Sequence, residues 1–91
     1  MNNVASRNRA VGIDIGGPLT VVADNTATHN GSDGIRVDVP DAGSAAEFAT
    51  IRGNQANKNR TIGINAITGF VNGGGNTASR NLVADCVGIT C

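Results

Sequence analysis

The sequence predicts an all-β protein in which short strands recur in a regular unit, and three observations lead to this fold class. The 91 residues include 13 Gly and 12 Asn, which tolerate left-handed turns and are poor in helix interiors. The apolar residues are mostly Val, Ile and Ala, in short runs that favour strands. A sequence pattern also recurs along the chain. A disordered chain is the alternative, but an apolar content of 40% argues against it.

The recurring pattern is Asn-x-Ala-x-x-Asn, and it occurs four times. The first Asn of each copy is Asn3, Asn25, Asn54 or Asn76, and the second is Asn8, Asn30, Asn59 or Asn81. The copies begin 22, 29 and 22 residues apart. Such repetition is typical of stacked architectures. Residues 1–91 are therefore predicted to form a single segment of four units that begin near residues 3, 25, 54 and 76.

Each unit continues with an alternating segment. A Gly-Ile pair follows the second Asn after four residues, at 12–13, 34–35 and 63–64, and a further small or apolar residue stands two positions later. This alternation predicts a strand with Asp14, Arg36 and Asn65 facing solvent. A second apolar run precedes the next motif. Each unit is interpreted as turn, strand, turn, strand, with the motif Ala at the inner corner of a turn.

A unit of 22 residues suits one coil of a β-solenoid, because larger repeats need more residues per unit. Coils stacked in parallel register lie about 4.8 Å apart. Equivalent Asn residues would then lie above one another and pass amide hydrogen bonds from coil to coil. The eight motif Asn residues are therefore predicted to form two structural ladders. Asn30 and Asn59 also match glycosylation acceptors, but ladder bonds would close them to glycans.

The second unit is seven residues longer than its neighbours. The additional residues fall in 38–46, where Pro40 cannot donate a strand hydrogen bond and the surrounding residues favour a turn. We expect a loop here that protrudes from one coil. Such a loop can carry function, or it can be an insertion without a role, since surface loops accept added residues at little cost.

Two stretches resemble a known family. Residues 25–37, Asn-Thr-Ala-Thr-His-Asn-Gly-Ser-Asp-Gly-Ile-Arg-Val, resemble the repeat of pectate-lyase-like proteins. Residues 74–81 with the ending 86–91 resemble the closing segment of secreted bacterial members. The resemblance implies a right-handed parallel β-helix of about four coils, located outside the cell or on its surface. Family members have more coils, so we expect further coils upstream or end-to-end self-association.

The chain ends in a segment, 82–91, that is predicted to cap the last coil. Cys86 and Cys91 are close enough in sequence to form a disulfide there, and the alternative is two unpaired thiols. A disulfide implies an oxidising compartment. Residues 1–9 lack the apolar centre of a signal peptide, and no apolar stretch is long enough to span a membrane. The expectation of export therefore rests on the cysteines and the resemblance.

The fifth motif position is basic in every copy, as Arg7, His29, Lys58 and Arg80. Stacking would align these residues, and Arg9 and Arg60 would widen the patch. One interpretation is a stripe that binds an acidic polysaccharide; the other is a solvated turn whose side chains splay apart. Seven basic and seven acidic residues give no net charge, so nothing calls for nucleic acid as a partner.

No catalytic signature is present. His29 is the single histidine, and its spacing from nearby Asp and Ser residues matches no catalytic triad. Two cysteines with one histidine are too few for a zinc site, and Asp14 with Asp38 too few for Ca²⁺. We predict no catalytic residue, metal or cofactor. The predicted function is a non-catalytic structural or carbohydrate-associated segment of an exported protein. The alternative is a fragment of a polysaccharide lyase or glycoside hydrolase acting on acidic polysaccharide.

Overall fold

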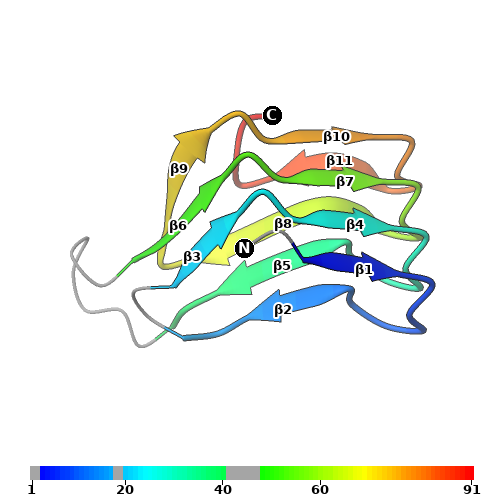
Figure 1. Cartoon of the computed structure of the whole chain (residues 1–91), viewed down its shortest axis with the longest axis horizontal. Coiled ribbons are helices and arrows are strands. Elements are labelled where there is room, and N and C mark those ends of the chain that lie inside the picture. Colours follow the sequence, from blue (N-terminus) through cyan, green and yellow to red (C-terminus); the bar gives the residue numbers. More distant parts are fainter. Residues whose placement is uncertain (1–2, 18–19, 41–47) are drawn as a thin grey trace.

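The computed structural model describes residues 3–17, 20–40 and 48–91, and in these ranges the chain forms β-strands and no helix (Figure 1). The strands make three parallel sheets. The first sheet contains β1 (Val4–Ser6), β4 (Thr26–Thr28), β7 (Gln55–Asn57) and β10 (Thr77–Ser79). The second contains β2 (Ile13–Ile15), β5 (Ile35–Asp38), β8 (Ile62–Thr68) and β11 (Ala84–Val87). The third contains β3 (Val21–Ala23), β6 (Ala49–Arg52) and β9 (Phe70–Gly74).

The chain visits the three sheets in turn, and each passage is called a rung below. The rungs are residues 3–24, 25–53, 54–75 and 76–91, and the fourth has described strands in the first two sheets. Val4 pairs with Thr26, Thr26 with Gln55, and Gln55 with Thr77. These partners are separated by the same 22, 29 and 22 residues as the motif copies. The predicted register of the repeat is therefore confirmed.

The motif itself is a strand, so its interpretation as a turn was wrong. Its middle residues form the strands of the first sheet, and Ala27 and Ala56 are fully buried between partly exposed neighbours. Alternation over three residues places the Ala side chain inside and its neighbours outside. One turn lies before the first Asn of the motif, and the other begins at the fifth motif position, directly before the second Asn. Each complete rung consequently has three strands rather than two.

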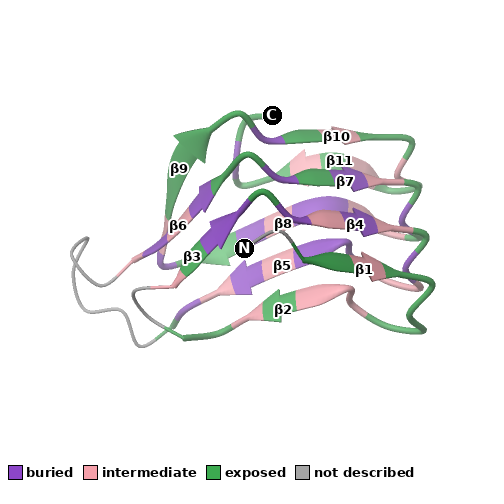
Figure 2. Cartoon of the chain, viewed as in Figure 1, coloured by how far each residue is buried: buried purple, intermediate pink, exposed green. Residues whose placement is uncertain are grey.

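The core runs through the centre of the stack (Figure 2). Its largest fully buried side chains are aliphatic, and they come mainly from the second and third rungs. Ile35 and Ile64 pair in register and are both fully buried, whereas Ile13, in the same row, is half-buried. Ile13 lies in the first rung, which another described rung covers on one side only. Burial of apolar surface therefore depends on stacking from both sides.

Part of the predicted loop at 38–46 is a strand. Asp38 is the last residue of β5, and the Val39 amide donates to the Thr68 carbonyl at 2.9 Å. Val39 is 1% exposed and packs in the core. The prediction of a loop beginning at residue 38 was wrong because these residues continue the pairing with β8. Residues 41–46 lie outside the described part of the chain.

The motif Asn residues form two hydrogen-bonded ladders, as predicted. In each ladder the backbone N–H and the side-chain Nδ2 of one Asn donate to Oδ1 of the Asn in the next rung. For Asn30 and Asn59 these distances are 3.1 and 2.9 Å. Asn59 Nδ2 also donates to the Ala27 carbonyl of the preceding rung at 3.1 Å. The two acceptors for glycosylation, Asn30 and Asn59, are 2% and 1% exposed, which closes them to modification.

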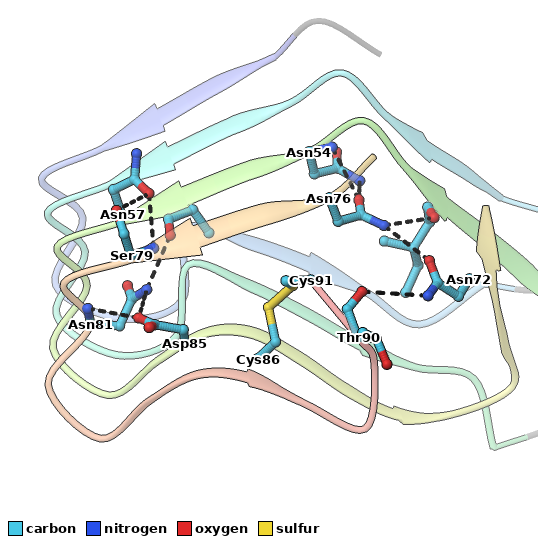
Figure 3. Close-up of a disulfide and its surroundings, with 12 residues drawn as sticks. Asn54, Asn57, Asn72, Asn76, Ser79, Asn81, Asp85, Cys86, Thr90 and Cys91 are labelled. Carbon is cyan, nitrogen blue, oxygen red and sulfur yellow. Dashed lines mark hydrogen bonds between the residues drawn. A yellow bond between two sulfur atoms is a disulfide. The ribbon is translucent and has the colours of Figure 1, made fainter. Parts of the chain in front are cut away.

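The last described segment covers the end of the fourth rung (Figure 3). Ala84–Val87, within the predicted cap, forms β11 and pairs with β8. Cys86 and Cys91 form the predicted disulfide, with a Cα–Cα distance of 6.3 Å, a span typical of such bonds. Ile89, between them, is 9% exposed and belongs to the core cluster. The short crosslinked loop thus folds an aliphatic side chain over the open end of the core.

Candidate functional site

The four basic motif residues form a column along one edge of the molecule. Arg7, His29, Lys58 and Arg80 each follow a strand of the first sheet directly, at the turn towards the second sheet (Figure 1). The backbone N–H groups of Arg7, His29 and Lys58 donate to carbonyls of the next rung at 3.2, 3.3 and 3.1 Å. All four residues are exposed. We call them the basic column.

Every member of the basic column has a left-handed backbone. The φ angles are 57°, 56°, 59° and 57° from Arg7 to Arg80. This conformation costs a non-glycine residue roughly 1–2 kcal/mol. A second left-handed position precedes the first Asn of the motif, and there the chain has Asp24, Gly53 and Gly75. Glycine relieves the strain at that position in two of the three rungs, whereas a basic residue bears it in every rung of the column. Such strain is characteristic of functional positions.

The described acidic residues are paired away from the basic column. Arg36 forms ion pairs with Asp14 and Asp38, both at 3.8 Å, and Arg52 forms one with Asp24 at 3.8 Å. The remaining described carboxylates, of Asp33 and Asp85, accept hydrogen bonds from neutral groups. Within the described ranges, no carboxylate forms an ion pair with the basic column, Arg9 or Arg60. Among the described residues, the cations of this edge therefore have no carboxylate at ion-pair distance.

A shallow groove of about 520 Å³ runs beside the column. His29, Lys58 and Arg80 line the groove. Three Asn residues of the second ladder, Asn8, Asn30 and Asn59, line it too, as do three residues that directly follow a ladder Asn. Those following residues are Gly31, Arg60 and Leu82, equivalent positions in successive rungs. A Cβ at Gly31 would collide with the Arg9 carbonyl, so glycine permits the close stacking there. The groove thus combines cationic side chains with Leu82, an aliphatic side chain that is 78% exposed.

The sequence interpretation missed two members of this groove. Gly31 and Leu82 are neither basic nor part of the motif, and the groove includes them because they stack with Arg60. Aligning the four units at the residue after the second Asn would have found this second row, Arg9, Gly31, Arg60 and Leu82. Arg9 belongs to the row but does not line the groove.

A second charged cluster lies on the outer face of the second sheet. Asp14, Arg36 and Asn65 are in register, as predicted for solvent-facing positions. Arg36 lies between two carboxylates, which compensate its charge. Asn65 donates to Oδ2 of Asp33 at 3.1 Å, and Asp33 also accepts bonds from Thr61 and the Ile62 amide. Asp33 therefore has a structural role beneath the turn and forms no described bond with His29.

Among the residues that the structure describes, no group of three His, Cys, Asp or Glu side chains is placed to hold a metal ion. The same residues include no helix of the length and apolarity needed to cross a membrane. Comparison with protein-family models, with curated proteins and with solved structures found no match to the chain. The function is accordingly inferred from the geometry of the chain itself.

Proposed function

We propose that this chain is a non-catalytic segment of an exported right-handed parallel β-helix, similar to pectate-lyase-like proteins, that binds acidic polysaccharide. Three parallel sheets visited in turn support about four coils of such a helix. The Cys86–Cys91 disulfide supports an oxidising compartment, and hence the extracellular space or cell surface. The basic column and its groove are the proposed glycan-binding surface.

The observation that carries the proposal is the row of basic residues on left-handed backbone, in which Arg7, Lys58 and Arg80 have no described ion pair. Lys58 and Arg80 occupy neighbouring rungs, and two unit charges at ~5 Å repel by about 0.8 kcal/mol even in water. The column therefore lowers the stability of the free protein in two ways, through backbone strain and through repulsion. A bound polyanion relieves the repulsion. A neutral structural turn gives no reason for placing a basic residue on strained backbone in all four rungs.

The spacing of the column suits a linear polymer. Rungs stack about 4.8 Å apart, which is close to the length of one sugar residue in an extended polysaccharide. A chain lying along the column can thus present successive carboxylates to successive rungs. Arginine can bind a carboxylate through two parallel hydrogen bonds. Leu82 and the floor of the groove can pack against the apolar face of a sugar ring.

The test is calorimetric titration with oligogalacturonate, at low and high salt. In the column variant, Lys58→Asn is combined with Arg80→Asn, because Asn tolerates a left-handed backbone. The control variant combines Arg36→Gln with Arg52→Gln and removes the same charge from residues already paired with acids. We expect the column variant to bind about tenfold more weakly, as two exposed ionic contacts of roughly 0.7 kcal/mol would give. Equal losses in the two variants, or unchanged binding by the column variant, would refute the proposal.

The alternative function, a fragment of a lyase or hydrolase, is favoured by one observation. Arg36 is partly exposed and lies between two carboxylates on the outer face of the second sheet. A lyase would form an unsaturated product from polygalacturonate in the presence of Ca²⁺. Activity that disappears in Arg36→Gln and persists in the column variant would establish this second function. Absence of product would leave binding as the function of this segment.

A further inference from the structure

The asparagine ladders have a direction. Each ladder Asn donates its backbone N–H and Nδ2 towards the next rung, and its Oδ1 accepts the same pair of bonds from the preceding rung. Asn54 shows both halves: it donates to Asn76 Oδ1 at 3.0 Å through each group and accepts from Asn25 at 3.0 and 3.1 Å. The two ends of the stack are therefore chemically different. One end presents ladder acceptors, and the other presents ladder donors.

The donor end is partly closed by the chain itself, most fully at the second ladder (Figure 3). The backbone N–H and Nδ2 of Asn81 both donate to Oδ1 of Asp85, at 3.2 and 3.1 Å. Asp85 thereby replaces the Asn that a further rung would supply. In the other ladder, Asn76 Nδ2 donates to Asn72 Oδ1 at 3.4 Å. The disulfide loop with Ile89 covers the core between the two ladders.

The acceptor end is open. No described residue donates a hydrogen bond to Oδ1 of Asn3 or of Asn8, although both side chains donate onwards to the second rung. In later rungs the residue after each ladder Asn donates its amide to the preceding rung, as Thr26 does to Asn3 and Gly31 to Asn8, at 2.9 and 2.7 Å. The equivalent amides of the first rung belong to Val4 and Arg9, and no described rung precedes them in the stack.

We infer that the edge of the first rung is a docking surface for another polypeptide rung carrying the same Asn-x-Ala-x-x-Asn motif in parallel register. Such a partner satisfies both kinds of open group. Its two Asn side chains donate to Asn3 and Asn8, and its two Asn carbonyls accept from Val4 and Arg9. Its motif Ala would cover Ala5, and its aliphatic residues would cover Ile13 and Ile15, which are half-buried in contrast to their counterparts in the second rung.

The hydrogen-bond direction also selects among possible partners. A second copy of this chain would have to offer its donor end, where Asp85 already takes the bonds of the second ladder and the disulfide loop adds Ile89 to the core. Two first-rung edges placed together would oppose ladder Oδ1 atoms to each other, and their strands would run antiparallel rather than in the parallel register of the stack. The partner is therefore a rung of like sequence whose donor end is uncapped. This assignment does not depend on glycan binding, although Asn8 belongs to both the docking edge and the lining of the groove.

The experiment joins a rung with the sequence of residues 54–75 directly before Asn3, in the register that this rung has before Asn76. Covalent linkage removes any dependence on affinity. We expect the amides of Val4 and Arg9 to exchange with deuterium at least about tenfold more slowly than in the native chain, and the midpoint of thermal unfolding to rise. Two controls use the same residues. One adds the rung after Cys91, at the capped end, and the other keeps it before Asn3 with Asp in place of its two ladder Asn residues.

Both controls should show no gain. Unchanged exchange at Val4 and Arg9 in the extended chain would overturn the inference, as would equal protection by the Asp-substituted rung. Equal stabilisation from the rung placed after Cys91 would show that the ends are equivalent and would also overturn it. Analytical sedimentation of the native chain tests whether the chain itself forms a dimer. A dimer whose formation protects Val4 and Arg9 would identify a second copy as the partner and reject the like-sequence rung.

Discussion

A single ladder asparagine performs several tasks that no other side chain of its size combines. Asn59 accepts two bonds through Oδ1 and donates through Nδ2 to Asn81 and Ala27. The carboxamide is the one small side chain with both an acceptor and two donors. At 1% exposure, Asn59 leaves water no access to partners that lose their bonds. The polar interior of this small protein is therefore both satisfied and intolerant of change.

Replacing Asn59 with Ala should lower the free energy of unfolding by about 3 kcal/mol or more, because several buried polar groups lose their partner and each costs roughly 1–3 kcal/mol. For a chain of this size, the unfolding midpoint should fall by ~15 °C or more. Urea denaturation followed by circular dichroism measures the change. Gln55→Ala, at an exposed position on the same rung, is the control and should change stability by less than about 0.5 kcal/mol. Equal effects would show that the ladder bonds contribute little.

Glycine at the Gly-Ile pair makes room for the second ladder. A Cβ at Gly34 would lie 2.5 Å from Asn59 Nδ2 and 2.7 Å from the Gly63 carbonyl. Gly34→Ala should therefore destabilise the protein by about 1–3 kcal/mol through overpacking. Gly16→Ala is the matched change, since its Cβ would have no neighbour nearer than the Asp38 carbonyl at 3.7 Å. The midpoint of thermal unfolding should be clearly lower for Gly34→Ala than for Gly16→Ala. Similar midpoints would contradict the steric explanation.

At the scale of elements, the last strand depends on its crosslinked end. β11 is paired with β8 on one side, and no described strand pairs with its other edge. The disulfide joins β11 to the chain that folds back over it, and Asn72 Nδ2 donates to the Thr90 carbonyl at 3.4 Å. Edge strands are the natural place for local opening. The disulfide therefore restrains one of the edge strands of the stack.

Reduction of Cys86–Cys91 should cost about 2 kcal/mol, as expected for so short a loop. The loss of stability should be confined to β11 and the residues around the disulfide. Amide exchange should accelerate in β11 and at Ile89, while the amides of β4 and β5 keep their protection. Exchange measured by mass spectrometry with and without reductant tests this, and Cys91→Ser provides the same state without reductant. A uniform acceleration through all rungs would indicate that the crosslink stabilises the stack as a whole.

At the scale of the whole molecule, stability comes from contacts between neighbouring rungs. The described stack has four rungs, and two of them are end rungs. Core residues of the two inner rungs are covered on both sides, and those of the first rung on one. The same side chain should therefore contribute differently according to its rung.

The row Ile13, Ile35 and Ile64 provides a matched series for this effect. Replacement of Ile35 or Ile64 by Val should cost about 1 kcal/mol each. Ile13→Val should cost less than about 0.5 kcal/mol, because the half-buried side chain loses less buried area. Urea denaturation of the three single variants measures the gradient. Equal costs in all three would mean that the first rung is covered as well as the inner ones.

Much of the fold could be predicted because the repeat places equivalent residues one rung apart. The spacing of the Asn motif predicted the register, the ladders and the alignment of the basic residues. It failed at Thr26–Thr28, where three residues are too few to distinguish a strand from a turn by alternation alone. It also failed at Asp38 and Val39, because Pro40 and the turn-forming residues after it masked the end of β5. The role of Asp85 was missed, since it mimics a ladder Asn without matching the motif.

The sequence by itself determined the periodicity, the positions that repeat and the identity of the ladder residues, because these depend on spacing along the chain. The tertiary structure decided how the charges are distributed. Ion pairs bring together Arg36 with Asp14 and Arg52 with Asp24, from different rungs, and so leave the basic column without a described partner. It also decided that one end of the stack is capped and the other open. Both results depend on side-chain direction and on contacts through space, and a one-dimensional pattern specifies neither.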